Sequence, residues 1–319
     1  MLLILRRDGT ALETITVTPG WRLPPDAVWV ELVEPVRAEE LAIEASVGLE
    51  LPTREEMAEI EVSSRLYQEH DATFMIATVL CSTDSGEPIL GPVTFVLAGE
   101  RLITIRYVHP RVFTAFAAQA LRQPELKQSG VAMFLGLLEA IVDRTADHLE
   151  RVSAQVDETG QDIFRQAQGA SFKPILNRLA LSQSTNGKGR ESLVSLSRVI
   201  SYAMLASQIV DNREARDELR SLQRDVQSLT EHASYVSGNL NFMLDAALGF
   251  INIEQNEITK IFSIAAVVLL PPTVIAGWFG MNFKHMPELD WPWAYPAALL
   301  GMLLSALAPL WWVKRKGWL

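Results

Sequence analysis

Residues 261–279 read IFSIAAVVLLPPTVIAGWF, a run of 19 residues without a charged side chain. A helix of this length spans roughly 28 Å, which is close to the thickness of the hydrocarbon core of a bilayer. Residues 291–313 form a second uncharged run of 23 residues. The sequence therefore predicts two transmembrane helices. Aromatic belts mark membrane interfaces, and six of the eight tryptophans lie at the edges of these runs: Trp278, Trp291, Trp293, Trp311, Trp312 and Trp318.

Charged residues beside the two runs predict how the chain is oriented. Lys314, Arg315 and Lys316 follow the second run directly, and Lys260 precedes the first. Positive residues mark the cytoplasmic side of a membrane, although Lys284 in the intervening loop departs from this rule. We therefore expect a multi-pass membrane protein with both termini in the cytoplasm. The N-terminal apolar run is too short for a signal peptide and reads as a first strand.

The rest of the chain has a different composition. Of the 319 residues, the first 260 carry 36 acidic and 24 basic side chains, a net charge of −12. This acidity argues against a nucleic-acid partner, which requires a basic face, and it suits a protein that meets cations. The single cysteine, Cys81, excludes an internal disulfide and a cysteine-based zinc site, and it agrees with a reducing compartment. We expect Cys81 to be a small buried residue in a strand.

Hydrophobic periodicity predicts an α+β membrane protein with an N-terminal cytoplasmic α/β domain, a long helical stalk and two C-terminal transmembrane helices. Strands are expected at residues 14–18, 28–32, 73–80, 93–97 and 102–107, short helices at 38–47 and 110–121, and long helical segments at 130–168, 172–208 and 213–280. The expected boundaries are 1–125 for the α/β domain, 126–260 for the stalk or funnel, 261–282 for the first span, 283–290 for the periplasmic loop, 291–313 for the second span and 314–319 for the basic tail.

The stalk segments contain two further features. Residues 183–189, QSTNGKG, interrupt the second segment; their Gly-Lys pair lacks the glycine spacing of a phosphate loop, so we interpret them as a solvent loop. The third segment has apolar residues spaced four and three apart, a stripe that packs a helix along its length. Its partner is either the same chain or a second subunit, or both. The stripe comprises Leu222, Val226, Leu229, Ala233, Val236, Leu240, Met243, Ala247 and Phe250.

The first span has a face on which polar and apolar residues alternate. Lipid-facing hydroxyl groups would have no purpose, so this face is typical of a helix that lines a polar lumen. A single helix pair cannot enclose such a lumen, and a pore requires an oligomer. The alternative is that each hydroxyl group bonds to a carbonyl of its own helix. The face comprises Asn256, Thr259, Phe262 or Ser263, Ala266, Leu270, Thr273 and Gly277.

Two further properties of the spans bear on the chemistry. Pro271 and Pro272 remove helix bonds to the carbonyls of Val267 and Val268, which bends the helix or exposes these oxygens to a lumen. Neither span contains an acidic residue, whereas an enzyme or a proton-coupled pump would place an ionisable group there. A channel for a strongly hydrated ion needs no such ionisable group. Mg2+ loses its water reluctantly, so neutral oxygens that bond its hydration shell can select it.

Four short motifs lie in and around the two spans: Gly280-Met281-Asn282-Phe283 at the outer end of the first span, Met286-Pro287-Glu288-Leu289 after it, Tyr295-Pro296, and the ending at residues 314–319. Through these motifs, residues 256–319 resemble the C-terminal part of the CorA family of magnesium channels. Residues 249–256 look like the proteobacterial branch, and weaker likenesses at residues 29–35 and 59–61 extend it over essentially the whole chain.

The resemblance implies a homopentamer of the bacterial inner (plasma) membrane with a cytoplasmic funnel. It implies Mg2+ as the transported and regulatory ion, with Co2+ and Ni2+ as further candidate substrates. It assigns Gly280, Met281 and Asn282 to the selectivity filter and Glu288 to the outer loop. Phe262 and Leu270 would form apolar constrictions that close by dewetting. The lumen would be lined by Asn256, Thr259, Phe262, Leu270 and Thr273, and the cytoplasmic pore neck would be ringed by Lys314, Arg315 and Lys316.

In the family, Mg2+ bound between cytoplasmic domains holds the channel shut. Carboxylates from adjoining subunits repel each other until a cation bridges them, so internal Mg2+ would favour the closed packing. Acidic helical faces are more often solvated surface, and the sensor residues do not align to unique positions. The candidates are Asp143, Asp147 and Glu150, which share a helix face with Asp157, together with Asp225 and Asp245.

Two alternatives remain at this stage. The first is a zinc-transporting branch of the same superfamily, whose filter usually reads Gly-Ile-Asn where this chain has Met281. The second is a membrane-anchored sensor or enzyme. We expect no enzyme, because the chain lacks an ordered Ser/His/Asp set, a His pair at metal-ligand spacing and a nucleotide loop.

Overall fold

The computed structural model describes residues 1–59, 61–82, 87–165, 171–281 and 286–316. The chain divides into two compact units, Met1–Leu244 and Asp245–Leu319, which are described separately. The long helix α8 (Arg213–Phe279) contributes to both units. Asn282 lies outside the described residues. The predicted domain boundaries stay a prediction.

Unit 1 contains a seven-stranded sheet in the order β2-β1-β3-β7-β6-β5-β4. Neighbouring strands are antiparallel except for the parallel pair β3 and β7. The predicted strands are present, but the one expected at residues 14–18 ends at Ile15. β5 and β6 are longer than expected, and Cys81 is buried in β5 as expected. The strands are β1 (Leu2–Arg6), β2 (Glu13–Ile15), β3 (Ala27–Val33), β4 (Leu66–Glu69), β5 (Ala72–Ser82), β6 (Pro88–Ala98) and β7 (Arg101–Arg106).

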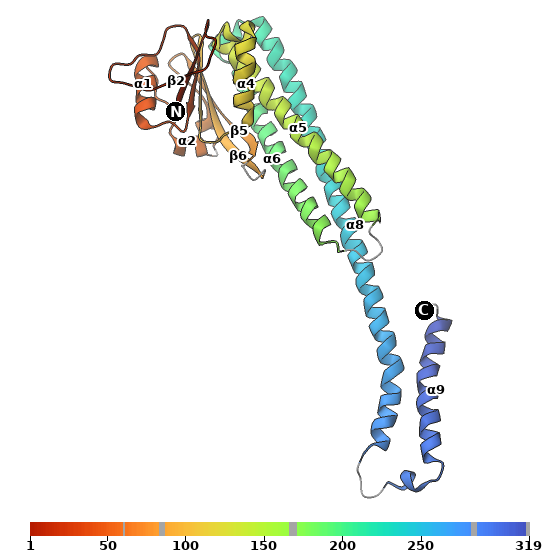
Figure 1. The fold of residues 1–319 in the computed structure, drawn as a ribbon. Helices are drawn as coiled ribbons and strands as arrows, with labels where there is room; N and C mark the ends of the chain where they lie inside the picture. The colour runs from red at the N-terminus through yellow and green to blue at the C-terminus, as the bar shows by residue number, and fades with distance from the viewer. Residues whose placement is uncertain (60, 83–86, 166–170, 282–285, 317–319) are drawn as a thin grey trace. The chain divides into compact units, whose positions relative to one another are not determined.

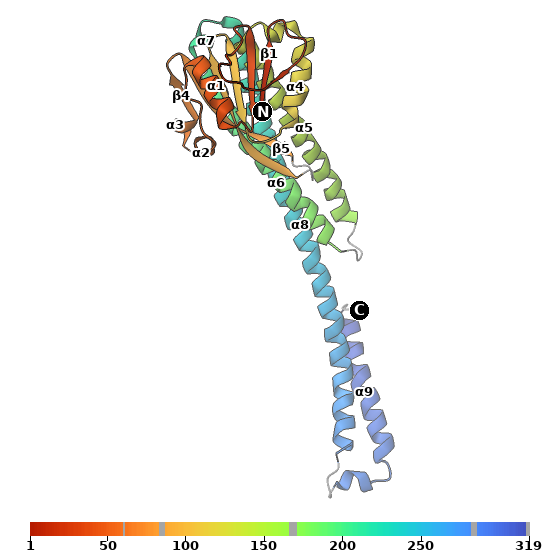
Figure 2. The same ribbon diagram turned by 60° about the vertical axis from the view of Figure 1, so that its left-hand side comes forward.

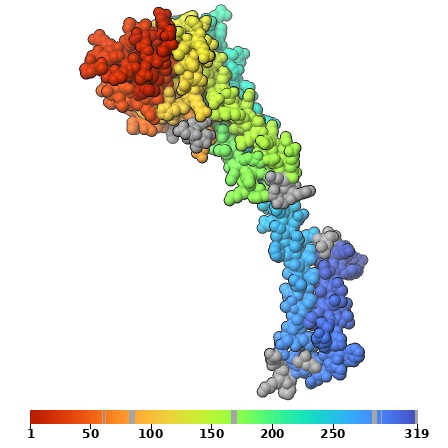
Figure 3. Space-filling model, in the orientation of Figure 1, coloured from red at the N-terminus to blue at the C-terminus, as the bar shows by residue number. Residues whose placement is uncertain are grey.

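Helices cover both faces of this sheet, with α1 on one side and α4, α5 and α6 on the other (Figures 1 and 2). The space-filling view in Figure 3 shows the N-terminal residues, in red and orange, beside the helical layer, in yellow and green. The helices of unit 1 are α1 (Arg37–Val47), α2 (Arg54–Ala58), α3 (Val62–Arg65), α4 (Arg111–Arg122), η1 (Pro124–Lys127), α5 (Gly130–Arg165), α6 (Lys173–Ala203) and α7 (Ser207–Val210), followed by the first part of α8.

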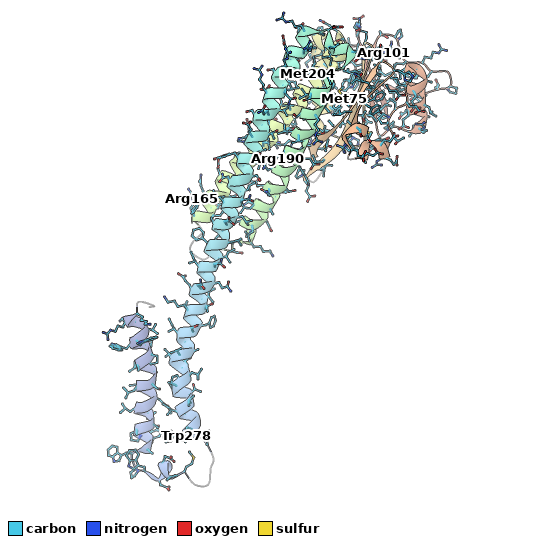
Figure 4. The ribbon with its side chains drawn as sticks, turned by 180° about the vertical axis from the view of Figure 1, so that it is seen from behind. Met75, Arg101, Arg165, Arg190, Met204 and Trp278 are labelled. Atoms are coloured by element: carbon cyan, nitrogen blue, oxygen red, sulfur yellow. The ribbon has the colours of Figure 1, made fainter. Side chains whose placement is uncertain are left out.

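Each face of the sheet has its own hydrophobic core. On the α1 side, Ile43 and Met57 pack with strand residues such as Phe74. On the other side, α4, α5, α6 and α8 form the larger core, to which Met75 of β5 and the partly buried Met204 belong; both are labelled in Figure 4. Because both of its faces are covered, every residue of β3 is buried, as expected for a central strand.

A row of polar side chains lies within the larger core, on the parallel pair β3 and β7. The indole Nε1 of Trp29 donates to Thr104 Oγ1 at 2.9 Å. Arg106 Nε donates to Glu31 Oε1 at 2.8 Å, and both side chains are almost fully buried. Burial raises the pKa of Glu31, and the nearby Arg106 guanidinium opposes this rise. Buried polar groups need such partners, since an unpaired one is costly.

Helix α6 corrects one sequence-based prediction. Residues 183–189 were expected to form a solvent loop, and they are helical within α6, where Asn186 and Gly189 are buried. Asn186 Nδ2 donates to the carbonyl of Ala233 on α8 at 2.8 Å. A Cβ at Gly189 would lie 3.1 Å from Leu149 Cδ2 of α5. Tertiary packing on both sides therefore overrides the low helix propensity of this segment.

The same helix closes an open edge of the sheet. Among the described residues, β4 pairs with β5 only over residues 72–75, and no other strand pairs with the rest of β5 on that side. The backbone N–H groups of Thr78 and Leu80 donate instead to Ser195 Oγ and Ser192 Oγ of α6, at 2.8 and 3.2 Å. Covering a strand edge in this way satisfies its backbone and prevents pairing with another chain.

We expect Ser192→Ala to lower the free energy of unfolding of unit 1 by about 2 kcal/mol, because the buried N–H of Leu80 would lose its acceptor. Urea denaturation of the full-length protein in detergent, followed by circular dichroism, measures this change. The exposed Ser234 bonds only to the carbonyl of Thr230 on its own helix, so Ser234→Ala is the matched control and should change little. Equal effects of the two substitutions would contradict the edge-closing role.

The apolar stripe on α8 packs within the chain along unit 1. Leu222, Val226 and Ala233 belong to the larger core. Val236 and Leu240 are also buried, and a Cβ at Gly160 of α5 would lie 2.8 Å from Met243 Cε. The prediction of an intramolecular helical bundle is confirmed for this part of the stripe. A second role as a subunit interface stays a prediction.

Unit 2 consists of residues 245–279 of α8, a short 3-10 helix η2 (Pro287–Asp290) and α9 (Ala294–Arg315). α8 and α9 are each long and apolar enough to cross a membrane. Trp278, labelled in Figure 4, lies near the end of α8 at the connection between the two helices. The two predicted spans therefore correspond to helices, and the second begins three residues later than expected because residues 291–293 precede α9.

Candidate functional site

The apolar part of α8 has two distinct faces. Six of its residues are partly buried, and all of them except Pro272 recur at intervals of three or four and so share one side: Ile264, Val268, Pro271, Ile275 and Phe279. This side meets α9, because a Cβ at Gly301 would lie 3.9 Å from Ile275 Cδ1. Since a helix turns about 100° per residue, the residues predicted to line the lumen lie on the opposite side.

Every predicted lumen residue in this helix is exposed. Phe262 and Leu270 have exposed fractions of 71% and 61%, and Asn256, Thr259 and Thr273 are exposed as well. The polar stripe is thus separate from the surface that packs on α9. One side of α8 is used within the subunit, and the side with the polar groups is left open.

The threonine hydroxyl groups of this face bond to their own helix. Thr259 Oγ1 donates to the carbonyl of Gln255 at 2.8 Å, and Thr273 Oγ1 donates to that of Leu269 at 2.7 Å. Both hydroxyl groups therefore donate within their own helix, as the alternative interpretation expected. Each oxygen keeps its lone pairs as acceptors, and water molecules that hydrate a cation direct their hydrogens outward. α8 continues as a helix through Pro271 and Pro272.

The residues predicted for the filter follow the end of α8. The backbone N–H of Gly280 donates to the carbonyl of Ala276 at 2.9 Å, and that of Met281 donates to Trp278 at 3.3 Å. Met281 is exposed. Glu288, predicted for the outer loop, is an exposed residue of η2. The predicted basic neck, Lys314–Lys316, lies at the other end of α9, and all three side chains are exposed.

Two of the predicted regulatory carboxylates line one groove on unit 1. The groove lies between α5 and α8, has a volume of about 410 Å³, and contains Asp143 and Asp225. Two further acids, Glu139 and Glu218, line it as well. Partial burial raises the pKa of Asp143, and the negative charges of Asp147 and Asp225 raise it further. Burial and the nearby Glu139 and Glu214 likewise raise the pKa of Glu218. The groove therefore favours positive charge.

The other regulatory candidates lie elsewhere. Asp147 is exposed and pairs with Arg144 at 3.4 Å, Glu150 is exposed further along α5, and Asp245 is an exposed residue of α8. Sequence reasoning missed Glu139 and Glu218. Glu139 lies four residues, about one helical turn, before Asp143, and Glu218 lies seven residues, about two turns, before Asp225. Among the described residues, no three His, Cys, Asp or Glu side chains converge to hold a metal ion within one chain.

Comparisons with known proteins place this architecture among metal-ion transport proteins of the membrane. The sequence profile of the family described as "CorA-like Mg2+ transporter protein" matches residues 25–315. The protein named magnesium transport protein CorA is 33% identical over 294 residues in Salmonella typhimurium and also in Escherichia coli K12, covering 92% of this chain and 92% of each relative. The chain therefore belongs to the CorA-like Mg2+ transporter family.

Solved structures show the same fold at lower sequence identity. The CorA magnesium transporter of Methanocaldococcus jannaschii has a TM-score of 0.76 at 16% identity, with 100% of this chain and 99% of that chain covered. The full-length CmaX protein has a TM-score of 0.71 at 16% identity, with 99% and 96% covered. The ZntB cytoplasmic domain of Vibrio parahaemolyticus has a TM-score of 0.59 over 79% of this chain. The predicted fold class is confirmed.

Proposed function

We propose that this chain is one subunit of a homopentameric channel that takes up Mg2+ across a bacterial inner membrane, with both termini in the cytoplasm. The observation that carries this proposal is the open polar face of α8, opposite the side that packs on α9. Family membership and the names of the relatives, which are magnesium transport proteins, support the choice of ion. Co2+ and Ni2+, which form similar hydrated ions, are further candidate substrates.

The pathway would be lined by Asn256, Thr259, Phe262, Leu270 and Thr273 of each subunit. Neutral acceptor oxygens suit a hydrated cation, because Mg2+ gives up its water reluctantly and a channel must bind it weakly enough to release it. A ring of Gly280, Met281 and Asn282 would select the ion at the outer end, with Glu288 attracting cations nearby. The basic residues 314–316 would surround the cytoplasmic neck.

Ion uptake into liposomes that contain the pure protein tests the proposal. We expect Mg2+ uptake that empty liposomes lack. Strong Zn2+ uptake without Mg2+ uptake would favour the zinc-transporting alternative, and uptake of neither would favour a membrane-anchored sensor. Native mass spectrometry of the purified oligomer tests the fivefold stoichiometry.

We further propose that internal Mg2+ closes the channel by binding carboxylates where two subunits meet. Asp143 and Asp225 are the best-placed candidates, because they share a groove with Glu139 and Glu218. Asp147, Glu150 and Asp245 are less well placed. Burial and the negative charges of Asp147 and Asp225 raise the pKa of Asp143, and a divalent cation in the groove would offset the repulsion between these carboxylates. Cation binding would therefore be coupled to the packing of α5 against α8.

Asp143→Asn is expected to raise the urea midpoint of unit 1 at pH 7. The pKa of Asp143 is raised in the folded protein, so its charged form destabilises the fold at neutral pH. This contribution disappears as the pH falls below the ordinary carboxyl pKa of about 4. The variant should therefore exceed the wild type at pH 7 and match it only well below pH 4. Circular dichroism of the full-length protein in detergent provides the measurement.

Added Mg2+ extends the same experiment to the regulatory proposal. At pH 7, Mg2+ should raise the urea midpoint of the wild type. The double variant with Asp143→Asn and Asp225→Asn should show a much smaller increase. Asp157 is an exposed aspartate on the same helix, and Asp157→Asn should leave the Mg2+ response unchanged. An undiminished response in the double variant would exclude the groove.

A further inference from the structure

The last turn of α9 carries two cations that are each stacked on a tryptophan. The guanidinium carbon of Arg315 lies 5.3 Å from the ring centroid of Trp311. Lys316 Nζ lies 4.5 Å from that of Trp312. Both pairs are four residues apart, and side chains in a helix lean toward its N-terminus, so each cation reaches back over its ring. Both distances lie within the range of cation–π attraction.

Neither cation has an anionic partner in the part of the chain that the structure describes. No carboxylate pairs with Lys314, Arg315 or Lys316 among the residues that the structure describes. The rings beneath them are open as well, with exposed fractions of 64% for Trp311 and 51% for Trp312. An exposed indole beside an unpaired cation suits a boundary where hydrocarbon meets negative charge.

The opposite end of the same helix has aromatic residues of the same kind and the opposite charge. Trp291 and Trp293 are exposed by 58% and 68%, and the nearest charged residues that the structure describes are Glu288 and Asp290. No stacked cation is present among the described residues of that end. Rings alone therefore do not distinguish the two ends of α9, whereas the stacked cations do.

We propose that Arg315 and Lys316, held on Trp311 and Trp312, bind the phosphates of anionic phospholipids at the cytoplasmic surface of the membrane. The stacked rings restrict the cations before a lipid arrives, which lowers the entropy lost on binding. The indoles occupy the boundary beneath the headgroups while the charges meet the phosphates. A dissolved anion would satisfy only the charges and leave both rings in water, so the occupant is a lipid. This inference rests on the proposed membrane orientation.

Native mass spectrometry of the full-length protein in detergent, titrated with phosphatidylglycerol or phosphatidylcholine, tests the inference. We expect the wild type to prefer phosphatidylglycerol by about thirtyfold, since Arg315 and Lys316 should each contribute about fivefold toward anionic lipid. Arg315→Gln and Lys316→Gln should each remove most of this preference. Lys314 lies in the same turn and is not stacked on a ring among the described residues, so Lys314→Gln is the matched control for charge and should have the smaller effect.

Two further variants separate stacking from charge. Trp311→Leu combined with Trp312→Leu keeps all three bases and should still lose most of the preference, whereas Trp293→Leu at the other end should not. Soluble glycerophosphoglycerol should fail to displace the lipid. Equal losses for the three basic residues, no preference in the wild type, or displacement by the soluble headgroup would each overturn the inference. The assay involves no ion flux, so its failure is distinct from a failure of the transport proposal.

Discussion

Asn282→Ala is expected to reduce Mg2+ uptake into liposomes by between about tenfold and a hundredfold. The carboxamide oxygen is proposed to accept hydrogen bonds from the hydration shell of the ion, and hydrogen bonds to a charged group contribute about 1.5–3 kcal/mol. One substitution removes the acceptor from every subunit of the proposed ring. The methyl group of alanine offers nothing in its place, so the hydrated ion would lose its binding site at the entrance.

The control for this experiment is Asn241→Ala. Asn241 is an exposed residue of α8 before the proposed span, so its replacement makes the same chemical change outside the pathway and should leave uptake unchanged. Native mass spectrometry shows whether both variants assemble like the wild type. Normal Mg2+ uptake by an assembled Asn282→Ala variant would refute the filter assignment and support an anchoring role for the two spans.

Much of the fold could be predicted because its signals are local in the sequence. Short runs rich in β-forming residues predicted most of the strands, since a sheet that is covered on both faces buries residues on each side of a strand. The two spans were predictable from length and the absence of charge, and α8 ends within one residue of its expected limit. The edge strand β4 gave no such signal, because only four residues pair there.

The continuity of α6 could not be predicted from its own residues. Asn, Gly and Ser favour loops when they are considered alone, and residues 183–189 contain several of them. In the fold, these small side chains fit the segments packed against α6. Gly189 leaves room for Leu149, Asn186 donates a hydrogen bond to α8, and Ser192 accepts one from the backbone of β5. Each reason involves a segment that is distant in the sequence.

The candidate site divides in the same way. The residues predicted to line the lumen follow helical periodicity, so it was predictable that they share one face of α8. The groove depends on the register of α5 against α8, which the sequence does not reveal. It joins Asp143 to Asp225, adds Glu139 and Glu218, and leaves Asp147 outside. The roles of the filter and of the pore neck stay predictions.

The buried pair of Glu31 and Arg106 should produce the largest change in stability. Arg106→Met would leave Glu31 buried without its partner, and Glu31→Leu would leave the guanidinium buried without a carboxylate. Each substitution is expected to lower the free energy of unfolding by about 3–5 kcal/mol. The variant with both substitutions should lose much less, because it leaves no unpaired buried charge. Urea denaturation of the full-length protein measures all three.

The pH dependence distinguishes the two single variants. The pKa of Glu31 is already raised by burial, and Arg106 partly offsets this rise. In Arg106→Met the pKa of Glu31 should rise further, so the destabilisation is complete above that raised value and diminishes as the pH falls and Glu31 binds a proton. In Glu31→Leu the unpaired guanidinium stays charged at every pH tested, and the deficit should persist in acid.

An exposed pair provides the matched control for these substitutions. Arg220 and Asp217 lie 2.8 Å apart on α8, with more than half of each side chain exposed, and water already solvates both charges. Arg220→Met and Asp217→Leu should each change the free energy of unfolding by less than about 1 kcal/mol. If the buried and exposed pairs gave similar small effects, burial would not be the source of the expected difference. A double variant at positions 31 and 106 as unstable as either single one would show that the pair itself stabilises unit 1.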